Sequence, residues 1–450
     1  MENKELTLLE VLNLAVEKQK GGKLDEAEIL YKKILEKYPS SSDAFHLLGL
    51  IEYEKGEYEK AVENIDKAIQ LNPEAVFYGN LGMCYDKLGD EEKSAECFLK
   101  ALGIDFEYKK AYLANYNLGI YFKEKGEIEK ALGYYDEAIR LNDDFSDAHW
   151  NRGLVLLLLG KFEEGWKEYE YRMKKESPVD SRIFDKPKWD GSVLNGKKIF
   201  VVSEQGFGDN LQFVRYLSLI KERRGYVILE CRKELINLFR SLKMVDEFVE
   251  KKNDFFDVDY DFYIHLMSLP RVFNTNLENI PNEVPYLKAD SELVEKFKSK
   301  FDKDKLKIGI VWSGNEKQDD NDNRSMKFEN FKSLIEMEGV QLFSLQKGEP
   351  AKQLDDENVV DIGKDINDFA DTAAVIENLD LIISVDTATA HLAGAMGKPV
   401  WVLLTKIPDW RWLLDRGDCP WYPTMKLFRQ KNLGDWDEVV ERVGVELGGK

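Results

Sequence analysis

The segment Asp386-Thr387-Ala388-Thr389-Ala390-His391-Leu392-Ala393-Gly394 follows directly on the apolar run Leu379-Asp380-Leu381-Ile382-Ile383-Ser384-Val385. An apolar run of this kind is typical of a buried parallel strand, and the residues after it predict a helix that begins where the strand ends. The first turn of such a helix has free backbone N–H groups and a positive dipole end, so it favours a bound diphosphate. Thr387 and Thr389 add hydroxyl donors there, and His391 follows one turn later. The alternative is structural, with Asp386 as a helix cap and His391 packed on the inner face.

The alternation of strand and helix patterns extends over the second half of the chain. The strand patterns form two sets, at 197–203, 226–230, 247–249 and 261–265 and then at 307–312, 340–345, 379–385 and 399–404. Such alternation predicts open parallel sheets with helices on their faces, and ligands bind at the carboxyl ends of the strands. We therefore predict an α/β region of two Rossmann-like halves that face a cleft, at 197–289 and 290–450.

The first third of the chain is internally repeated. Small residues recur at Ala15, Gly49, Gly82, Gly119 and Gly153, at intervals of roughly 34 residues. A series of larger residues keeps the same interval, at Tyr31, Ile65, Phe98, Tyr135 and Tyr169. Small residues let paired helices approach closely, and large residues fill the space between them. The pattern predicts an α-helical repeat solenoid over 1–175, joined to the α/β region by an irregular linker at 176–196.

Composition and charge narrow the classes of function. The chain has 450 residues and a formal net charge of −20, and such an acidic surface repels nucleic acid and anionic membranes. Its four cysteines form no C-x-x-C pair, which predicts reduced thiols rather than a zinc site or a disulfide framework. The sequence shows no signal peptide and no apolar run long enough to span a bilayer. We therefore predict a cytoplasmic protein with no membrane span, no nucleic-acid partner and no bound metal.

The loop Glu204-Gln205-Gly206-Phe207-Gly208-Asp209-Asn210 is the second candidate for chemistry. It lies between the first strand of the α/β region and a helix predicted at about 211–222. Gly206 and Gly208 let the backbone approach a ligand closely, but the dinucleotide-binding pattern would need a third glycine in place of Leu211. Asp209 has two interpretations. It caps the helix, or its carboxylate lies at the mouth of the cleft and accepts a proton from a hydroxyl nucleophile.

Cationic and polar side chains follow other strands of the second half. Arg324 or Lys327, which come after the strand that ends in Trp312-Ser313-Gly314-Asn315, would neutralise a departing diphosphate or would simply be solvated. Gln346 and Lys347 end the next strand at the same edge of the sheet. The D-x-D pattern at 319–322 would hold Mg²⁺, although an exposed acidic loop is the favoured interpretation.

Two aromatic segments also contain candidate functional residues. Asp409-Trp410-Arg411-Trp412 follows the 399–404 strand and is expected to reach the cleft. The stretch 420–430, which contains Trp421 and Tyr422, either stacks on a nucleobase or clamps the C-terminal helix at 435–443. Clamping is the favoured interpretation.

The repeat array resembles the tetratricopeptide repeat. Within one unit the consensus offsets are occupied by Tyr78, Leu81, Gly82, Tyr85, Phe98 and Ala101. The resemblance implies a concave groove for a polypeptide, in which Asn80, Asn117 and Asn151 bond an extended backbone. Consensus asparagines that bind nothing are the alternative.

Residues 190–445 resemble the glycosyltransferase-like domain found behind tetratricopeptide repeats in many bacterial proteins, which is similar to the heptosyltransferase family of GT-B glycosyltransferases. The resemblance rests on Gly208-Asp209, Arg324-Ser325, Leu345-Gln346-Lys347-Gly348, the segment from Asp386 through Ala393, and the tail from Trp421-Tyr422-Pro423 to Arg429-Gln430. It implies an α/β GT-B fold, with the acceptor side at 197–289 and the nucleotide-sugar side at 290–450.

This resemblance also implies roles for individual residues. Asp209 matches the catalytic base, and Arg324 takes the place of a phosphate-binding lysine. Asp386 and His391 match the nucleotide-sugar motif D-x-G-x-x-H, in which Ala388 replaces the glycine. The implied reaction is a single inverting displacement that needs no metal and no cofactor beyond the nucleotide-sugar co-substrate. The repeat array would bring a polypeptide acceptor or partner.

Two other functions stay open at this stage. The chain would be a non-catalytic interaction scaffold if its nucleotide-binding domain is degenerate, and Ala388 supports that interpretation. A nucleotide-activated epimerase of similar two-domain shape is the other alternative, and it would form no new glycosidic linkage.

Overall fold

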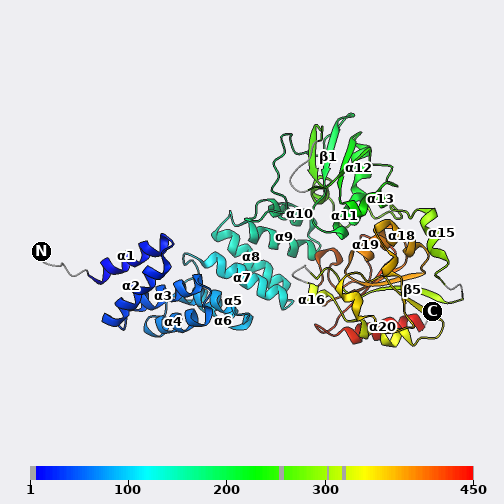
Figure 1. The fold of residues 1–450 in the computed structure, drawn as a ribbon. Helices are drawn as coiled ribbons and strands as arrows, with labels where there is room; N and C mark the ends of the chain where they lie inside the picture. Colours follow the sequence, from blue (N-terminus) through cyan, green and yellow to red (C-terminus); the bar gives the residue numbers. More distant parts are fainter. Residues whose placement is uncertain (1–6, 253–257, 302–303, 317–320, 449–450) are drawn as a thin grey trace. The chain divides into compact units, whose positions relative to one another are not determined.

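The computed structural model describes residues 7–252, 258–301, 304–316 and 321–448. Its internal contacts divide the chain into two units, Met1–Val155 and Leu156–Lys450. Figure 1 shows helices from blue to cyan in the first unit and an α/β arrangement from green to red in the second. Asp319 and Asp320 of the predicted D-x-D pattern lie outside the described residues. Within the described residues, none of the helices has the length and apolarity needed to cross a membrane.

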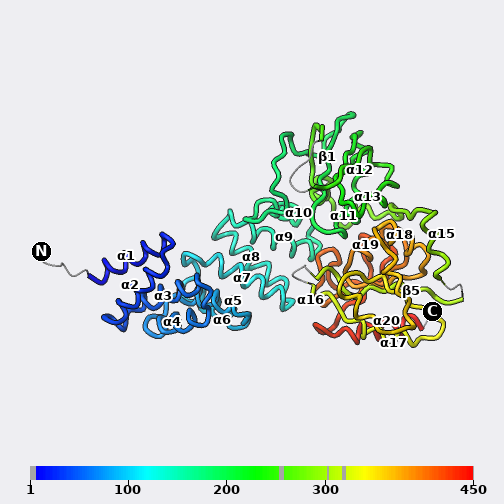
Figure 2. Tube along the Cα trace, in the orientation of Figure 1, coloured from blue at the N-terminus to red at the C-terminus, as the bar shows by residue number. Residues whose placement is uncertain are grey.

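The first unit is a succession of helix pairs, whose path is followed along the tube in Figure 2. Its helices are α1 (Leu8–Lys20), α2 (Leu24–Lys37), α3 (Ser42–Glu54), α4 (Tyr58–Leu71), α5 (Ala75–Lys87), α6 (Glu91–Ile104), α7 (Ala111–Glu124) and α8 (Ile128–Leu141), and α9 (Ser146–Leu158) runs across the boundary. The turns within pairs contain Gly22, Gly56, Gly89 and Gly126, whose φ angles of 74° to 80° are left-handed. Glycine adopts this conformation without the strain that a Cβ would cause.

Small and large residues pair across each helix hairpin, as the repeat pattern predicted. A Cβ added at Gly49, Gly82 or Gly119 would lie only 2.7, 2.8 or 2.5 Å from the side chain of Ile65, Phe98 or Tyr135, respectively. These approaches leave no room for a methyl group, so the glycines are required for close packing. The predicted α-helical repeat solenoid is confirmed.

The second unit contains two parallel sheets. The smaller sheet has the order β3-β2-β1-β4, and the larger has the order β10-β9-β8-β5-β6-β7. The strands of the smaller sheet are β1 (Lys198–Val202), β2 (Tyr226–Cys231), β3 (Glu247–Glu250) and β4 (Phe262–His265). Those of the larger sheet are β5 (Leu306–Val311), β6 (Val340–Ser344), β7 (Val360–Asp361), β8 (Leu381–Val385), β9 (Val400–Leu404) and β10 (Met425–Arg429). The predicted α/β fold with two parallel sheets is confirmed, although β7 and β10 were not predicted.

Helices cover both faces of the larger sheet in Figures 1 and 2, with α18 (Phe369–Glu377) and α19 (Ala388–Ala395) on one face and α17 (Lys332–Ile335) and α20 (Trp436–Gly448) on the other. The remaining helices are α11 (Phe207–Phe213), α12 (Leu217–Glu222), α13 (Lys233–Phe239), α14 (Leu269–Val272), α15 (Ser291–Lys298) and α16 (Asn321–Arg324). Short 3-10 turns include η1 (Glu170–Met173), η4 (Phe328–Phe331), η5 (Glu349–Gln353) and η7 (Trp410–Trp412). Strands β8 and β9 are buried along their whole length, as their continuous apolar sequences predicted.

Helix α10 (Phe162–Tyr169) comes from the last predicted repeat but packs within the second unit. Phe162, Trp166 and Tyr169 are each 2% exposed. Phe162 stacks on Trp421 with ring centroids 6.1 Å apart, and Trp166 meets Trp410 edge-on at 5.2 Å. The boundary between the two units, after Val155, therefore lies inside the range 1–175 predicted for the repeat array.

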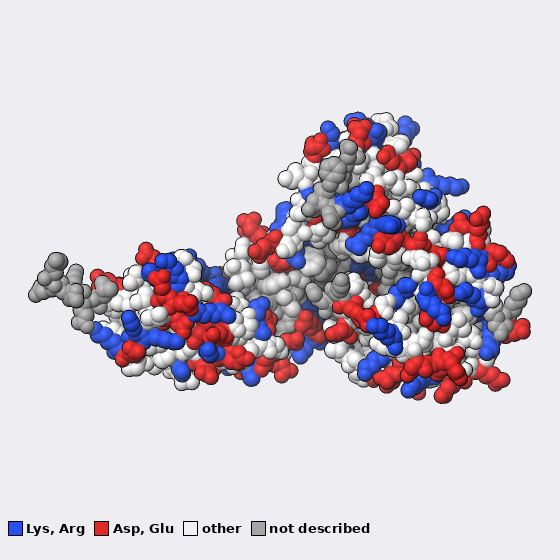
Figure 3. All heavy atoms as spheres, viewed as in Figure 1, with Lys and Arg blue, Asp and Glu red and all other residues white. Residues whose placement is uncertain are grey.

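Acidic and basic side chains are interspersed over the visible face of each unit in Figure 3. On this face basic side chains lie among the acidic ones, although the chain as a whole carries a net charge of −20.

Candidate functional site

The candidate site forms where two strand-to-helix junctions meet. Helix α11 follows β1, and helix α19 follows β8. A Cβ added at Gly208 would lie 2.9 Å from His391 Cδ2 and 3.7 Å from Ala388 Cα, so the first turns of the two helices are in contact. The carboxyl ends of β1 and β8 therefore converge, as expected for ligand sites of parallel sheets.

Asp209 lies in the first turn of α11 and not before it. The helix begins at Phe207 rather than near residue 211, because the Asp209 carboxylate bonds back to the start of the helix: Oδ2 accepts a 2.7 Å hydrogen bond from Gly206 N. The prediction that Asp209 caps the helix is therefore confirmed, but the predicted helix start was wrong. The side chain keeps 16% of its surface exposed, so capping does not remove it from reach.

Arg411 joins Asp209 to the other half of the unit. Its Nη2 donates to Asp209 Oδ1 in a very short contact, Nη1 donates to Asp409 Oδ1 at 2.7 Å, and Nε donates to Gln212 Oε1 at 2.9 Å. The guanidinium also lies over the Trp410 ring, 4.3 Å from its centroid. Burial raises the pKa of Asp209, and the Arg411 charge opposes that shift without cancelling it.

His391 and Asp386 form the second part of the site. His391 Nε2 lies 3.8 Å from Asp386 Oδ1, and Nδ1 shares a 3.0 Å hydrogen bond with the Tyr422 hydroxyl. The imidazole stacks on Trp412 with ring centroids 5.3 Å apart. Burial lowers the pKa of His391 well below its ordinary value, so the ring is neutral near pH 7. Burial, reinforced by Asp409, raises the pKa of Asp386 to about 6.

The N-terminus of α19 is not capped by a side chain. Its N-cap is Thr387, whose side chain does not bond the helix amides, and Thr387 Oγ1 instead shares a 2.8 Å hydrogen bond with Ser384 Oγ. The alternative in which Asp386 caps this helix is therefore wrong. Thr389 lies half-buried in the first turn. Uncapped first-turn amides are the groups that bind anions at helix N-termini.

Arg324 brings a positive charge to the same place. It ends α16, and a Cβ added at Gly314 would lie 2.5 Å from its Nη2, so the guanidinium packs against the turn after β5. Its charge opposes the burial-driven rise in the pKa of Asp386 and adds to the burial-driven fall in the pKa of His391. The structure thus places Arg324 near Asp386 and His391, the residues with which it was predicted to bind the nucleotide-sugar.

Gln346 and Lys347 lie at the same sheet edge but bond the protein itself. Gln346 Oε1 accepts hydrogen bonds from Trp312 N at 3.0 Å and Ser313 N at 2.9 Å. Lys347 Nζ donates to the carbonyls of Gly363 and Ile366, each at 2.9 Å. Both side chains hold loops beside the site, and a direct contact with a nucleotide-sugar stays a prediction.

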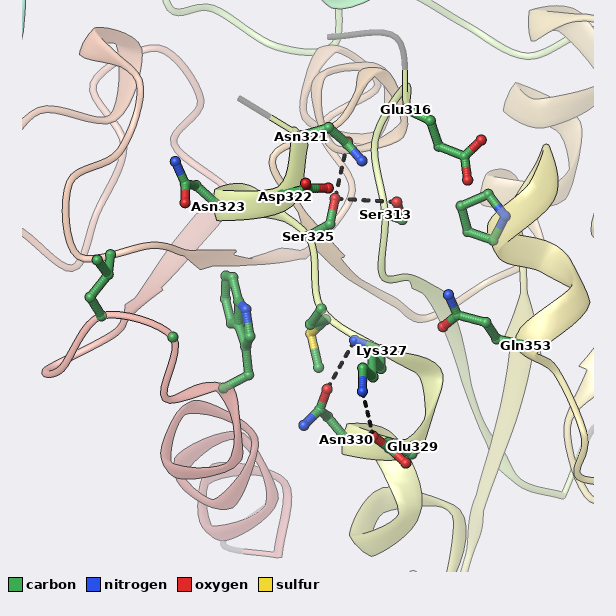
Figure 4. Close-up of a pocket in the computed structure, with 15 residues that line it drawn as sticks. Ser313, Glu316, Asn321, Asp322, Asn323, Ser325, Lys327, Glu329, Asn330 and Gln353 are labelled. Carbon is green, nitrogen blue, oxygen red and sulfur yellow. Dashed lines mark hydrogen bonds and ion pairs between the residues drawn. The ribbon is translucent and has the colours of Figure 1, made fainter. Parts of the chain in front are cut away.

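A cavity of about 710 Å³ lies beside α16, on the larger sheet's side of the unit. Figure 4 shows Ser325 between Asn321 and Ser313, with hydrogen bonds of 3.0 and 3.2 Å between their side chains. Lys327 also lines this cavity, whereas Asp209, Arg324, Asp386 and His391 do not. The cavity is therefore separate from the junction of α11 and α19.

The three repeat asparagines use their amides within the array. Asn80 Nδ2 and His46 Nε2 lie 2.7 Å apart, and both side chains are buried. Asn117 Nδ2 donates to Leu113 O at 2.8 Å, and Asn151 Nδ2 donates to Tyr116 Oη at 3.1 Å. Peptide binding by these residues stays a prediction, and Asn80 would have to give up its buried bond to take part.

Burial decides between the two interpretations of the aromatic segment at 420–430. Trp421 and Tyr422 are fully buried, so they act as clamps rather than as an exposed platform for a base. Trp421 packs against Phe162 and Trp410, and Phe428 of the same segment shares a core cluster with Val439 and Val443 of the C-terminal helix. Across the described residues, no three histidine, cysteine or acidic side chains gather into a group that would hold a metal ion.

Several residues of the site were not predicted from the sequence. Arg411 was noted only as part of a segment expected to reach the cleft, and its bond to Asp209 could not be read from a separation of 202 residues. Tyr422 and Trp412 hold His391 but appeared only as aromatic residues of their segments. An arginine between two tryptophans near a strand end was the one available signal.

Known proteins match both parts of the chain. Residues 277–421 match glycosyltransferase family 9 (heptosyltransferase). Four tetratricopeptide-repeat matches cover residues 12–41, 42–75, 75–108 and 119–160. Repeats of this type suggest protein–protein interaction, and the family 9 domain implies a nucleotide-sugar donor.

Individual proteins are similar to larger or smaller parts of this chain. Protein FlbA of Caulobacter vibrioides is 28% identical over 427 residues, which cover 86% of this chain and 70% of FlbA. The UDP-N-acetylglucosamine–peptide N-acetylglucosaminyltransferase of Giardia intestinalis is 33% identical over 126 residues, or 27% of this chain and 8% of that protein. The crystal structure of the MamA protein aligns with 38% of this chain and 91% of its own, at 24% identity and a TM-score of 0.33. The family matches support a glycosyltransferase: the chain carries tetratricopeptide repeats in its N-terminal region and a glycosyltransferase family 9 (heptosyltransferase) domain in its C-terminal half.

Proposed function

We propose that the second unit transfers a sugar from a nucleotide-sugar donor to an acceptor hydroxyl by one inverting displacement. The observation that carries the proposal is the contact between two junctions: a general-base candidate, Asp209, which keeps part of its side chain exposed, lies beside the uncapped N-terminus of α19. The acceptor hydroxyl requires a base, and the departing diphosphate requires an anion-binding site next to that base.

The donor diphosphate binds at the first turn of α19. The backbone N–H groups there and the Arg324 guanidinium supply the positive field, and Thr387 and Thr389 supply hydroxyl donors. His391 is neutral, and when Tyr422 donates to Nδ1, the proton of the ring is on Nε2, which faces the site. That N–H donates to the leaving phosphate oxygen without adding a full charge.

The displacement itself uses Asp209. The acceptor hydroxyl loses its proton to the Asp209 carboxylate while its oxygen forms a bond to the anomeric carbon. The bond from that carbon to the phosphate oxygen breaks, and the nucleoside diphosphate leaves on the opposite face, which inverts the anomeric centre. Arg411 holds the carboxylate in place and favours its ionised form. Arg324 and the α19 N-terminus take the charge-neutralising role that a metal has elsewhere, so transfer is expected to persist in a chelator.

The repeat array is proposed to bring a polypeptide acceptor or partner to the transferase. The tetratricopeptide matches support a protein–protein role, and the Giardia relative is, by its name, an enzyme that joins a sugar to a peptide. An extended peptide is the ligand class that solenoids of helix pairs accommodate along their concave surface.

The first test is donor binding followed by transfer. A panel of nucleotide-sugars and nucleoside diphosphates is measured by thermal shift, and the donor that stabilises the protein is then assayed with candidate acceptors. Asp209→Asn is expected to lower kcat by about 10³-fold while donor affinity changes less than about threefold. Asp259→Asn, an exposed aspartate of the same half that pairs with Lys198, is the matched control and should leave kcat unchanged.

Full activity of Asp209→Asn would reduce this residue to a helix cap. Absence of binding by every donor and diphosphate would favour the second candidate function, a non-catalytic scaffold. That candidate has its own support, because Ala388 stands in place of the motif glycine and its Cα lies close to Gly208. A changed sugar nucleotide without a new glycosidic linkage would instead indicate an epimerase.

A further inference from the structure

Helix α10 reaches both halves of the second unit beside the candidate base. Its residues Phe162, Trp166 and Tyr169 lie on one face, because they are spaced by four and then three positions. Trp166 Nε1 donates to Thr275 O at 3.0 Å on the smaller-sheet side. The Tyr169 ring meets Trp410, the neighbour of Arg411, with centroids 6.2 Å apart. The helix thus packs against the turn that carries the partner of Asp209.

Tyr169 also bonds the loop that leads into α11. Gln205 Nε2 donates to the Tyr169 hydroxyl at 2.8 Å. Gln205 has a φ of 57°, a left-handed conformation that non-glycine residues adopt only when their surroundings hold them there. Its carbonyl accepts a 2.5 Å hydrogen bond from Arg232 Nη2. Gln205 is therefore held in this strained conformation by two hydrogen bonds, one from its side chain and one to its backbone carbonyl.

A buried ion pair joins the same two segments, the one that contains Tyr169 and the loop that contains Gln205. Arg172, in η1, is fully buried and binds Glu204 in a bidentate pair, with Nε to Oε2 at 2.9 Å and Nη2 to Oε1 at 2.8 Å. Glu204 Oε1 also accepts from Met267 N at 3.0 Å. A paired and fully hydrogen-bonded arrangement of this kind fixes geometry, because either charge alone would be strongly unfavourable. It keeps η1, and with it Tyr169, in register with the loop.

We propose that Tyr169, at the end of the last repeat helix, is a positioning residue for Asp209. The connection runs from the Tyr169 hydroxyl to the Gln205 side chain, from Gln205 to the next residue Gly206, and from Gly206 N to Asp209 Oδ2. The inference rests on the proposed function and adds to it that α10, a helix with the repeat pattern, supplies a part of the transferase site. The same repeat position that fills space between helices in earlier units has a second role in this one.

The test compares two tyrosines at equivalent repeat positions. Tyr169→Phe removes only the hydroxyl that Gln205 bonds, and Tyr135→Phe removes the hydroxyl of the equivalent buried tyrosine one repeat earlier, in the first unit. For Tyr169→Phe we expect kcat to fall about tenfold, with the donor KM changed less than twofold, because a displaced base affects the transition state rather than ground-state binding. Tyr135→Phe is expected to keep the wild-type kcat.

A double-mutant cycle identifies the route. On a Gln205→Ala background, Tyr169→Phe should have no further effect on kcat, since the bond is already absent. Independent, additive losses would overturn the proposal, as would an unchanged kcat in Tyr169→Phe.

Hydrogen–deuterium exchange separates this proposal from the proposed function. Tyr169→Phe, but not Tyr135→Phe, should speed the exchange of a peptide covering residues 203–213. If the wild-type protein transfers no sugar but Tyr169→Phe still exchanges faster than wild type, the positioning contact is sustained and the transferase is refuted. Unchanged exchange would overturn the positioning role whatever the activity.

Discussion

At the scale of single residues, the two carboxylates of the site lie in different electrostatic surroundings. Asp209 binds Arg411 and the Gly206 amide, both of which favour its ionised form. Asp386 lies beside a neutral imidazole and near Asp409, and burial disfavours its charge. The sequence identified both residues, but it gave no means to tell which of them has a cation in direct contact. That cation, Arg411, comes from a distant segment and so depends on tertiary packing.

The raised pKa of Asp386 predicts a pH-dependent stability. Its folded-state pKa is about 6 against an ordinary value of 3.8, so the folded protein binds more protons than the unfolded chain between these values. Its contribution to stability is full below about pH 4 and is lost as the pH rises through 6. In Asp386→Asn this residue does not titrate, so the unfolding free energy of the variant relative to wild type should rise by about 2 to 3 kcal/mol from pH 4 to pH 7. Urea unfolding at both pH values measures the difference, and a flat difference would contradict the burial argument.

At the scale of elements, the site depends on how closely α11 and α19 approach. The sequence predicted a helix after each strand, because an apolar run followed by a polar, glycine-bearing turn is typical of parallel sheets. It did not predict the start of α11 at Phe207, since Asp209 bonds backward to Gly206 from inside the helix. It also could not show that the two helices touch, because β1 and β8 belong to different sheets.

Gly208→Ala tests this approach. The added Cβ would lie 2.9 Å from His391 Cδ2, a distance that forces the ring or the helix to move. We expect a loss of about 1 to 3 kcal/mol in stability and at least a tenfold loss in kcat/KM. Gly103→Ala is the control, because a Cβ at that helical position meets nothing within 4 Å. Wild-type activity in Gly208→Ala would show that the contact between α11 and α19 is not needed for transfer.

At the scale of the whole molecule, the chain is two units with separate cores. The repeat rhythm predicted the helical solenoid, and the strand alternation predicted the parallel α/β fold. The boundary was harder to predict, because α10 has the repeat pattern but buries its aromatic face among Trp410, Trp421 and Thr275. One helix of repeat type therefore belongs to the unit that carries the candidate site.

Gly119→Ala tests whether the units are energetically separate. The new Cβ would lie 2.5 Å from the buried Tyr135 ring, so the first unit should lose about 1 to 3 kcal/mol of stability. The second unit should keep its donor-induced rise in melting temperature, because its core and site are unchanged. Calorimetry with and without the donor measures both effects. A reduced donor response would mean that the two units unfold as one.

The sequence by itself determined the solenoid, the parallel α/β fold and the identity of the two junction segments. These features follow from local periodicity: small and large residues at a fixed interval, and apolar runs that end in glycine-bearing turns. Only the tertiary structure decided that Arg411 binds Asp209, that Tyr422 and Trp412 hold His391, and that Tyr169 bonds Gln205. The physical reason is distance along the chain. These contacts join segments tens to hundreds of residues apart, and no local pattern records which side chains meet once the sheets and helices have packed.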